Sequence, residues 1–550
     1  MERRTRKKRA NLIAQGGIMA VAILFANACI LLRQIPLTVM WGDEGNSIYA
    51  SAYGIFSLAW LISSYGLPIA MSGLLKPRLQ QRQYKNAAKV MQTVFLYGTI
   101  TSAVLGAGLF FGSSWLTEYV MQERLSALPL QILSVALIFT AWNGVLRGFF
   151  IGNGAGFPVV ISVILEQVVT LAVGIPMARI LEERGAKIGA LLQNASFSQS
   201  FAVQGFCCGI LAGTVIAFVP LLFIYLTSHS YYKKKNGKDS GRQREGLIQI
   251  ISVFFICLLP IVIYGIFTKG NLFVEQIFFR QCMKDNLSSG AVAKQWGIYY
   301  GKYKIFTSIP VVLTIAMGSN LRDRVYSLAR KRDTHHMQNI IQNVFQASMA
   351  VAIPLSVMVG VLSGLILDTF FPGQDTETAA VLLMAGFVTS VFFSAAYLLA
   401  EVLWGMKYHI TILLCGISAF TIHVGILYVM LEMLHFDILG VLYADILYSF
   451  LLLFLIGSAV WRKCRLSLRV LRSTVSFVIA SGAMTVALLL LNRLLAKALT
   501  GAVLLPALIL TGFVVYFIVL LLLRGVREKT LYLIPGGKLI CTLAKGARLL

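Results

Sequence analysis

The sequence predicts an all-α polytopic membrane protein with about 14 transmembrane helices. Of its 550 residues, 58% are hydrophobic and only 13% are charged, whereas a soluble globular chain carries about 25% charged residues. Apolar runs of about 20 residues recur along the whole chain, and each is long enough to cross a bilayer as a helix. Lysine and arginine gather in short clusters between alternate runs, a pattern that orients helices in a membrane.

Dividing the apolar runs at charged residues and at glycine or proline gives the predicted spans. In chain order they are 11–39, 47–75, 88–113, 127–151, 158–181, 203–227, 247–268, 300–321, 340–368, 376–404, 409–431, 437–460, 470–496 and 500–523. The region 247–321 allows two interpretations, one long bent helix or a helix followed by a broken segment. It carries Glu275 and Arg280 within an otherwise apolar stretch.

The segments between the spans form two alternating sets that differ in charge. One set, which includes both ends of the chain, contains the basic segments ERRTRKKR, KPRLQQRQYKNAAK, YYKKKNGKDSGRQR, RDRVYSLARKRD and WRKCRLSLR. The other set is mixed or acidic and contains WGDEGNS, TEYVMQERLS and DTFFPGQDTET. Because basic loops face the cytoplasm, we expect both termini on the cytoplasmic side of the cell membrane. The net charge of +26 is then explained by the basic loops that orient the chain in the membrane. The sequence has no basic domain and no aromatic RNA-binding signature, so this charge does not indicate a nucleic-acid partner.

A short internal sequence repeat predicts the domain organisation. VLRG at 145–148 closes the fourth span and VLWG at 402–405 closes the tenth, six helices apart. Duplicated helix sets are common in transporters. We therefore expect an N-terminal six-helix lobe at 1–227, a basic cytoplasmic linker at 228–246, a C-terminal six-helix lobe at 247–460, and two extra helices with a cytoplasmic tail at 461–550.

No catalytic constellation is visible in the sequence, so we do not expect an enzyme. The GxxxxGK[ST] phosphate loop is absent, the eight cysteines have neither metal-ligand nor disulfide spacing, and GNGAGFP at 152–158 favours a tight turn between two spans. We expect no cofactor or metal, and energy for transport from a proton, a sodium ion or the membrane potential.

Polar and charged residues inside or at the edges of the spans are the candidate site. An ionisable group at membrane depth is costly and points to function. Arg33, about two turns before the outer end of its span, either faces a polar cavity or extends to the membrane surface. Arg147 either has a functional role or orients its helix in the membrane. Glu166 either has a functional role or makes an internal hydrogen bond that holds helices together. The substrate-binding candidates are Arg33, Arg147 and Arg280, and the candidates for a coupling ion or an internal network are Glu166, Gln167, Glu275 and Glu401.

Two sequence blocks resemble the polysaccharide-transport (stage V sporulation protein B/MurJ-like) branch of the multidrug/oligosaccharidyl-lipid/polysaccharide exporter superfamily. The first holds Arg33, the G-D-E-G-x-x-x-Y segment at 42–49, Tyr53 and GLPIAMS at 66–72. The second, LRGFFIGNGAGFPVVISVILEQVV, contains Arg147 and Glu166. Similarity of motifs is confined to about the first 180 residues, while the helix layout matches over the whole chain.

The resemblance implies two lobes around a central cavity and a flippase that moves an undecaprenyl-pyrophosphate-linked oligosaccharide or peptidoglycan precursor by alternating access. It implies a lipid-linked glycan and membrane lipids as partners, and Arg33 as the cation that meets the diphosphate; we expect a monomer. The chain departs from the family pattern in two places. The family usually has a lysine almost directly after the GLPIAMS segment, whereas here Gly73 follows it and the first lysine is Lys76. At the end of the eighth span this chain has Arg322 and Asp323 in place of the family pattern. Lipid II is therefore not assumed as the substrate.

Three other functions remain open from the sequence. A multidrug or cation antiporter of the same superfamily would keep the fold but place acidic residues in its cavity. A membrane glycan polymerase or ligase would have a long outer loop with arginine and histidine, whereas the outer loops here are short and contain only His435. A scaffold that recruits glycan enzymes is the third.

Overall fold

The protein is helical throughout the part of the chain that the structure describes. The computed structural model describes residues 2–236, 244–464, 469–495, 500–526, 528–534, 537, 541–542 and 546, and these ranges contain helices, turns and bends but no strand. The all-α class predicted from the sequence is confirmed. Of the predicted linker at 228–246, residues 237–243 lie outside the described residues.

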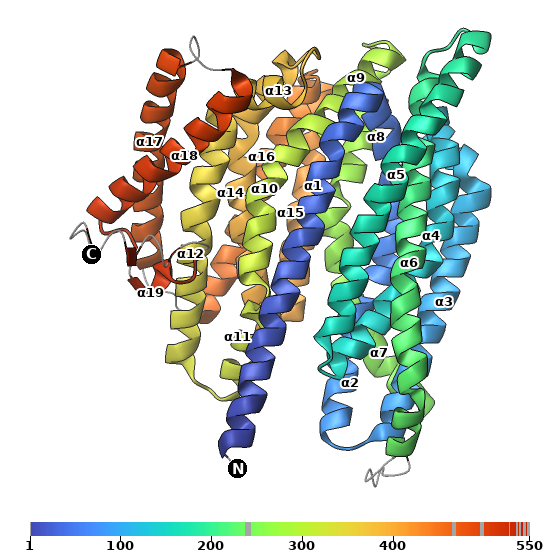
Figure 1. Ribbon diagram of the computed structural model, residues 1–550, viewed down its shortest axis with the longest axis vertical. Coiled ribbons are helices and arrows are strands. Elements are labelled where there is room, and N and C mark those ends of the chain that lie inside the picture. The colour runs from blue at the N-terminus through green and yellow to red at the C-terminus, as the bar shows by residue number, and fades with distance from the viewer. Residues whose placement is uncertain are drawn as a thin grey trace. The chain divides into compact units, whose positions relative to one another are not determined.

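The chain divides into two compact units, Met1–Gly297 and Ile298–Leu550 (Figure 1). The first unit contains helices α1 to α8 and nearly all of α9. The second contains α10 to α19. The lobe boundaries at 1–227 and 247–460 stay a prediction.

The helices of the first unit are joined by short connections. They are α1 (Glu2–Trp60), α2 (Leu67–Gln80), α3 (Tyr84–Trp115), α4 (Ala127–Gly152), α5 (Gly156–Leu192), α6 (Ser196–Asn236), α7 (Leu247–Lys269), α8 (Asn271–Met283) and α9 (Ser289–Ile298), with π-helical turns at Leu61–Tyr65 and Leu116–Val120 and a 3-10 turn at Arg124–Ser126.

The second unit begins with a π-helical turn and ends with a short helix. Its elements are the π-helical turn Tyr299–Tyr303, α10 (Lys304–Gly318), α11 (Leu321–Arg330), α12 (Thr334–Val361), α13 (Ser363–Phe370), α14 (Glu377–Gly405), α15 (His409–Tyr428), a π-helical turn at Val429–Met433, α16 (Ile438–Cys464), α17 (Arg469–Leu495), α18 (Gly501–Leu522) and α19 (Glu528–Leu531).

Thirteen helical segments among the described residues are long and apolar enough to cross a membrane. The first, Leu24–Gln80, takes in parts of two predicted spans, because α1 is two helices joined by a kink at Gly42. There φ is 66° and ψ is −169°, a conformation that glycine adopts without the steric penalty of a side chain. The prediction of about 14 spans therefore agrees with the fold.

The region 247–321 follows the second of the two interpretations offered by the sequence. Helix α7 ends at Lys269, Gly270 interrupts the run, and the short helices α8 and α9 precede α10. Arg280 lies in the last turn of α8 and Glu275 in the middle of the same helix.

Close glycine contacts hold the helices of the first unit together. A Cβ added at Gly148 of α4 would lie 2.7 Å from Cβ of Met71 and 2.9 Å from Cα of Pro68 on α2. Figure 1 shows α5 and α6 side by side, and a Cβ at Gly209 would lie 2.2 Å from Cα of Gly174. Small residues at such crossings allow helices in a membrane to approach closely.

The two copies of the short sequence repeat, VLRG and VLWG, occupy different positions on their helices. VLRG lies one turn before the end of α4 at Gly152, whereas VLWG ends α14 at Gly405. Each nevertheless includes a close helix contact, since a Cβ at Gly405 would lie 2.7 Å from the backbone oxygen of Arg322 at the start of α11. The duplication stays a prediction.

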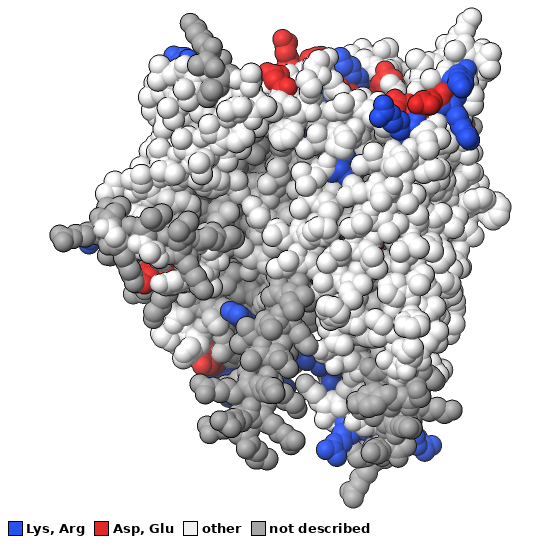
Figure 2. Space-filling view, viewed as in Figure 1, with Lys and Arg blue, Asp and Glu red and all other residues white. Residues whose placement is uncertain are grey.

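Charged side chains are distributed as in a membrane protein. On the face drawn in Figure 2 most lysine, arginine, aspartate and glutamate side chains gather toward the two ends of the helices, and the band between them is largely uncharged. Helix α5 has 37 residues, about 55 Å at 1.5 Å per residue, and so exceeds the ~30 Å hydrocarbon core. The chain is a multi-pass membrane protein.

Candidate functional site

Arg33 is a half-buried cation without a counter-ion among the residues described. It lies on α1, nine residues before the kink at Gly42, which is about 14 Å along the helix. Its guanidinium carbon lies 5.1 Å from the centre of the Phe206 ring on α6, within the range of a cation–π contact. Its buried Nε has no hydrogen-bond partner, and no described carboxylate forms an ion pair with it. An anion is the ligand that such a group lacks.

Aromatic residues from the first sequence block surround Phe206. Trp41 and Tyr49 stack with ring centres 5.8 Å apart, and Tyr49 stacks on Tyr53 at 5.4 Å. The edge of Phe206 meets Trp41 at 5.9 Å and Tyr49 at 5.8 Å. The motif aromatics therefore fix the ring against which Arg33 lies.

Asn46 joins the two parts of α1 across the kink. Its Oδ1 accepts hydrogen bonds from Gln34 Nε2 at 3.0 Å, Thr38 Oγ1 at 3.1 Å and Trp41 Nε1 at 2.8 Å. All four side chains are buried. The sequence analysis did not identify Asn46, because the polar segment WGDEGNS looked like a loop between two spans.

Arg147 and Glu166, predicted separately as a substrate cation and a coupling acid, form one ion pair. Arg147 Nη2 on α4 donates to Glu166 Oε2 on α5 at 2.5 Å and to Ser162 Oγ at 2.8 Å. Gln167 beside this pair is buried, and its Oε1 has no hydrogen-bond partner within the described part of the chain. The charge of Arg147 is thus already compensated, unlike that of Arg33.

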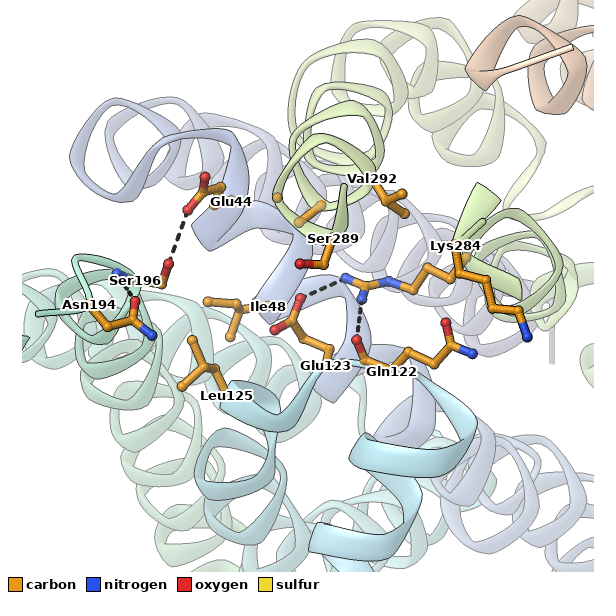
Figure 3. Close-up of a pocket in the computed structure, with 13 residues that line it drawn as sticks. Glu44, Ile48, Gln122, Glu123, Leu125, Asn194, Ser196, Lys284, Ser289 and Val292 are labelled. Carbon is orange, nitrogen blue, oxygen red and sulfur yellow. Dashed lines mark hydrogen bonds and ion pairs between the residues drawn. The ribbon is translucent and has the colours of Figure 1, made fainter. Parts of the chain in front are cut away.

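Arg280 lines a polar pocket of about 350 Å³. The side chain of Arg280 is 4% exposed, and its Nη2 donates to Glu123 Oε2 at 2.8 Å and to Ser47 Oγ at 2.6 Å. Figure 3 shows Glu123 at one side of the pocket and Glu44 with Ser196 at the other; Ser196 Oγ lies 3.4 Å from Glu44 Oε2. Carboxylate, hydroxyl, amide and guanidinium groups together can bind a ligand rich in hydroxyl groups.

Glu275 is fully buried one turn before the residues that line the pocket. Its Oε1 accepts a hydrogen bond from Asn271 Nδ2 at 3.1 Å on the same helix, α8. The next residue, Gln276, donates to Ser51 Oγ at 2.8 Å and ties α8 to α1. These bonds make α8 part of the polar core of the first unit.

In the second unit, Glu401 pairs with Arg322, the residue that departs from the family pattern. Arg322 Nε and Nη2 on α11 donate to Glu401 Oε2 and Oε1 on α14 at 2.7 and 2.8 Å. The guanidinium carbon also lies 5.5 Å from the ring centre of Trp404. Two hydrogen bonds between one arginine and one carboxylate fix both side chains. Arg322, which departs from the family pattern, therefore pairs with Glu401 and holds α11 against α14.

The sequence analysis missed three ionisable residues within apolar helices of the second unit. They are Lys304 on α10, His423 on α15 and Asp445 on α16. Each lies inside a predicted span, and an ionisable residue at membrane depth is a recognised sign of function. The spans were judged by total hydropathy, and these residues were passed over.

No group of three or more histidine, cysteine, aspartate and glutamate side chains that could hold a metal ion occurs in the described ranges. The candidate residues described above are mainly arginines, their carboxylate partners and aromatic rings. This is the chemistry of anion and hydroxyl-group recognition.

Comparisons with known proteins agree with the resemblance drawn from the motifs. Residues 48–204 match the family described as "Polysaccharide biosynthesis protein". The chain is 22% identical to stage V sporulation protein B of Bacillus subtilis (strain 168) over 98% of this chain and 100% of the relative.

Two solved structures have a similar fold. A lipid II flippase MurJ in its inward closed conformation has a TM-score of 0.63 and 13% identity over 91% of this chain and 97% of its own. A multidrug resistance MATE family transporter in an inward-facing conformation has a TM-score of 0.58 and 14% identity over 81% of this chain and 98% of its own.

Proposed function

We propose that the chain flips a lipid-linked glycan across the cell membrane. The premise is that it belongs to the polysaccharide-transport branch of the multidrug/oligosaccharidyl-lipid/polysaccharide exporter superfamily. The family relation supports a membrane transporter or flippase. The finer proposal names the cargo: an oligosaccharide or peptidoglycan precursor joined through a diphosphate to a polyprenyl lipid, moved outward by alternating access for polysaccharide or cell-wall synthesis.

The observation that carries this proposal is the uncompensated charge of Arg33. A guanidinium at membrane depth costs a few kcal/mol, and the Phe206 ring offsets about 0.5–2 kcal/mol of that cost. A diphosphate accepts two parallel charge-assisted hydrogen bonds from one guanidinium, which is the geometry that arginine provides. The bound cargo would thus supply the missing counter-charge.

Arg147 and Arg280 have a secondary place in this proposal. Each already pairs with a carboxylate, Glu166 or Glu123, so each binds a diphosphate only when that carboxylate turns away or takes up a proton. Glu166 and Gln167 then control Arg147. Glu275 organises the helices near Arg280, and Glu401 organises helices within the second unit. The membrane potential, negative inside, favours outward movement of an anionic head group.

The antiporter alternative has less support from the ionisable groups. An acceptor of organic cations needs an available carboxylate, but Glu166 and Glu401 each pair with an arginine. The described carboxylates at these two predicted positions are therefore neutralised, and the cation Arg33 is not. This favours an anionic cargo.

The test is head-group exposure in proteoliposomes that contain a fluorescent undecaprenyl-diphosphate oligosaccharide. We expect wild-type protein to bring inner-leaflet head groups to an external quencher or lectin, and Arg33→Ala to lose at least about 10-fold in rate, equivalent to 1.4 kcal/mol. Arg124→Ala is the matched control, because Arg124 is exposed and pairs with Glu118. Wild-type rates in Arg33→Ala would refute the role of Arg33. Uptake of an organic cation with no head-group exposure would assign the chain to the antiporter alternative.

A further inference from the structure

Two titratable side chains pair inside the second unit and a third lies on a neighbouring helix, and none of them has a place in the function proposed above. Lys304 is the first residue of α10, His423 lies in α15 and Asp445 lies in α16. Both His423 and Asp445 are fully buried, with 0% exposure. All three lie within helical segments that are apolar enough to cross the membrane.

Lys304 and Asp445 form an ion pair between α10 and α16. Lys304 Nζ lies 2.7 Å from Asp445 Oδ2. The ammonium also lies 5.1 Å from the ring centre of Tyr299 and 5.8 Å from that of Tyr303. The lysine side chain is 22% exposed and the aspartate is not exposed.

His423 contacts the residues of α16 that come before and after Asp445. Its Nδ1 lies 3.2 Å from the backbone oxygen of Ala444, the residue before Asp445. Its ring centre is 4.7 Å from that of Tyr448, one turn after Asp445 on α16. With Nδ1–H as the donor to a carbonyl, the neutral imidazole has Nε2 as its acceptor nitrogen. A movement of α16 that shifts Asp445 therefore also changes the surroundings of His423.

The π-helical turn before α10 contacts α14 and the segment that precedes it. From the π-helical turn before α10, Tyr303 donates to the backbone oxygen of Gly386 on α14 at 3.3 Å. Lys302 on the same turn donates instead to the backbone oxygen of Asp375 at 3.2 Å. In the contacts described here, Lys304 pairs with Asp445, and His423 lies against the residues of α16 on both sides of Asp445.

We propose that Lys304, Asp445 and His423 form a proton-binding site through which the second unit couples a conformational change to proton movement. The ligand is a single proton, which bonds to a carboxylate oxygen of Asp445. As the O–H bond forms, the contact with Lys304 breaks, and Lys304 keeps its own proton, so the site gains one positive charge. When that proton leaves toward the opposite side, the carboxylate pairs again with Lys304. That this exchange drives transport rests on the proposed function, but the protonation itself does not.

The energetics of the pair make it suitable for such exchange. An ion pair favours the carboxylate, whereas an isolated buried position favours the carboxylic acid. A buried pair gains little net stability, because desolvation offsets most of the Coulomb attraction. A small separation of α10 from α16 therefore changes which form of Asp445 is stable.

Infrared difference spectroscopy tests the protonation directly and needs no cargo. Wild-type protein in lipid film, moved from about pH 8 to about pH 5, should gain the C=O stretch of a protonated carboxyl, and Asp445→Asn should lack this band. Glu401→Gln is the matched control, since Glu401 is another carboxylate that pairs with a cation in this unit, and it should keep the band. In Lys304→Gln the band should be present already at pH 8. A purely structural ion pair would give no such shift, and a difference spectrum identical in wild type and Asp445→Asn would overturn the proposal.

Transport with and without a pH gradient tests the coupling. We expect the initial rate of head-group exposure in wild-type proteoliposomes to change at least about 3-fold when a gradient is imposed, and the rate in Asp445→Asn to be the same in both conditions. If wild type transports but ignores the gradient, the coupling is refuted. If no lipid-linked glycan moves but the Asp445 infrared band is present, the proposed function fails and the proton-binding site stands.

Discussion

Replacement of Asn46 by alanine removes one acceptor that serves three buried donors, and we expect a large loss of stability. The Oδ1 atom of Asn46 accepts from Gln34, Thr38 and Trp41. A buried donor without a partner costs about 1–3 kcal/mol. Counting only Gln34 and Trp41, and allowing some relaxation, the loss is about 2–4 kcal/mol. At about 2 °C per kcal/mol for a unit of this size, the apparent Tm should fall by about 4–8 °C.

The assay is thermal unfolding in detergent, followed by reaction of a fluorescent maleimide with cysteines that become exposed. Cys29 and Cys207 in the first unit are buried and serve as reporters. Asn46→Asp keeps the acceptor and should lose much less than Asn46→Ala. Asn153→Ala is the control, because the Asn153 side chain makes one hydrogen bond among the described residues, from Nδ2 to Phe149 O, and its loss should change Tm little. An Asn46→Ala protein with wild-type Tm would refute the reasoning that Asn46 fixes the kink.

Three further predictions follow from the same packing. Gly42→Ala forces a residue with a Cβ to a φ of 66° and a ψ of −169°, a region that is essentially restricted to glycine, and should cost about 1–3 kcal/mol, measured as a lower Tm; a wild-type Tm would contradict the argument from backbone conformation. Gly209→Ala places a Cβ 2.2 Å from Cα of Gly174 and should cost about 1–3 kcal/mol by overpacking, with an unchanged Tm as the opposing result. Glu401→Gln leaves Arg322 without its carboxylate and should lower Tm, while a variant with both residues replaced by Gln should recover part of the loss; additive losses would show that the two do not interact.

The membrane fold could be predicted from composition alone, because length and hydropathy determine which segments can cross a bilayer. The kink was harder to predict. WGDEGNS was interpreted as a loop, whereas Gly42 alone leaves the helical conformation and α1 continues to Trp60. The bonds that Asn46 makes between residues on both sides of Gly42 explain why these polar residues remain helical.

The candidate residues could be found in the sequence, but their pairing could not. Arg147 and Glu166 were singled out for different roles, as were Glu401 and Arg322. Whether two charged residues on different helices meet depends on helix crossing and rotation, which hydrophobic patterns do not specify. The glycines at 144, 148 and 152 were a readable signal of close packing, although their partners on α2 were not.

The measurement that tests the central claim most directly compares two lipids that differ only in the diphosphate. One is the undecaprenyl-diphosphate oligosaccharide, and the other is the same oligosaccharide joined to the same lipid through a neutral glycosidic bond. We expect wild-type protein to expose the diphosphate lipid at least about 10-fold faster, a preference of 1.4 kcal/mol, and Arg33→Ala to lose that preference while Arg124→Ala keeps it. A preference for the diphosphate lipid that survives in Arg33→Ala would contradict the account.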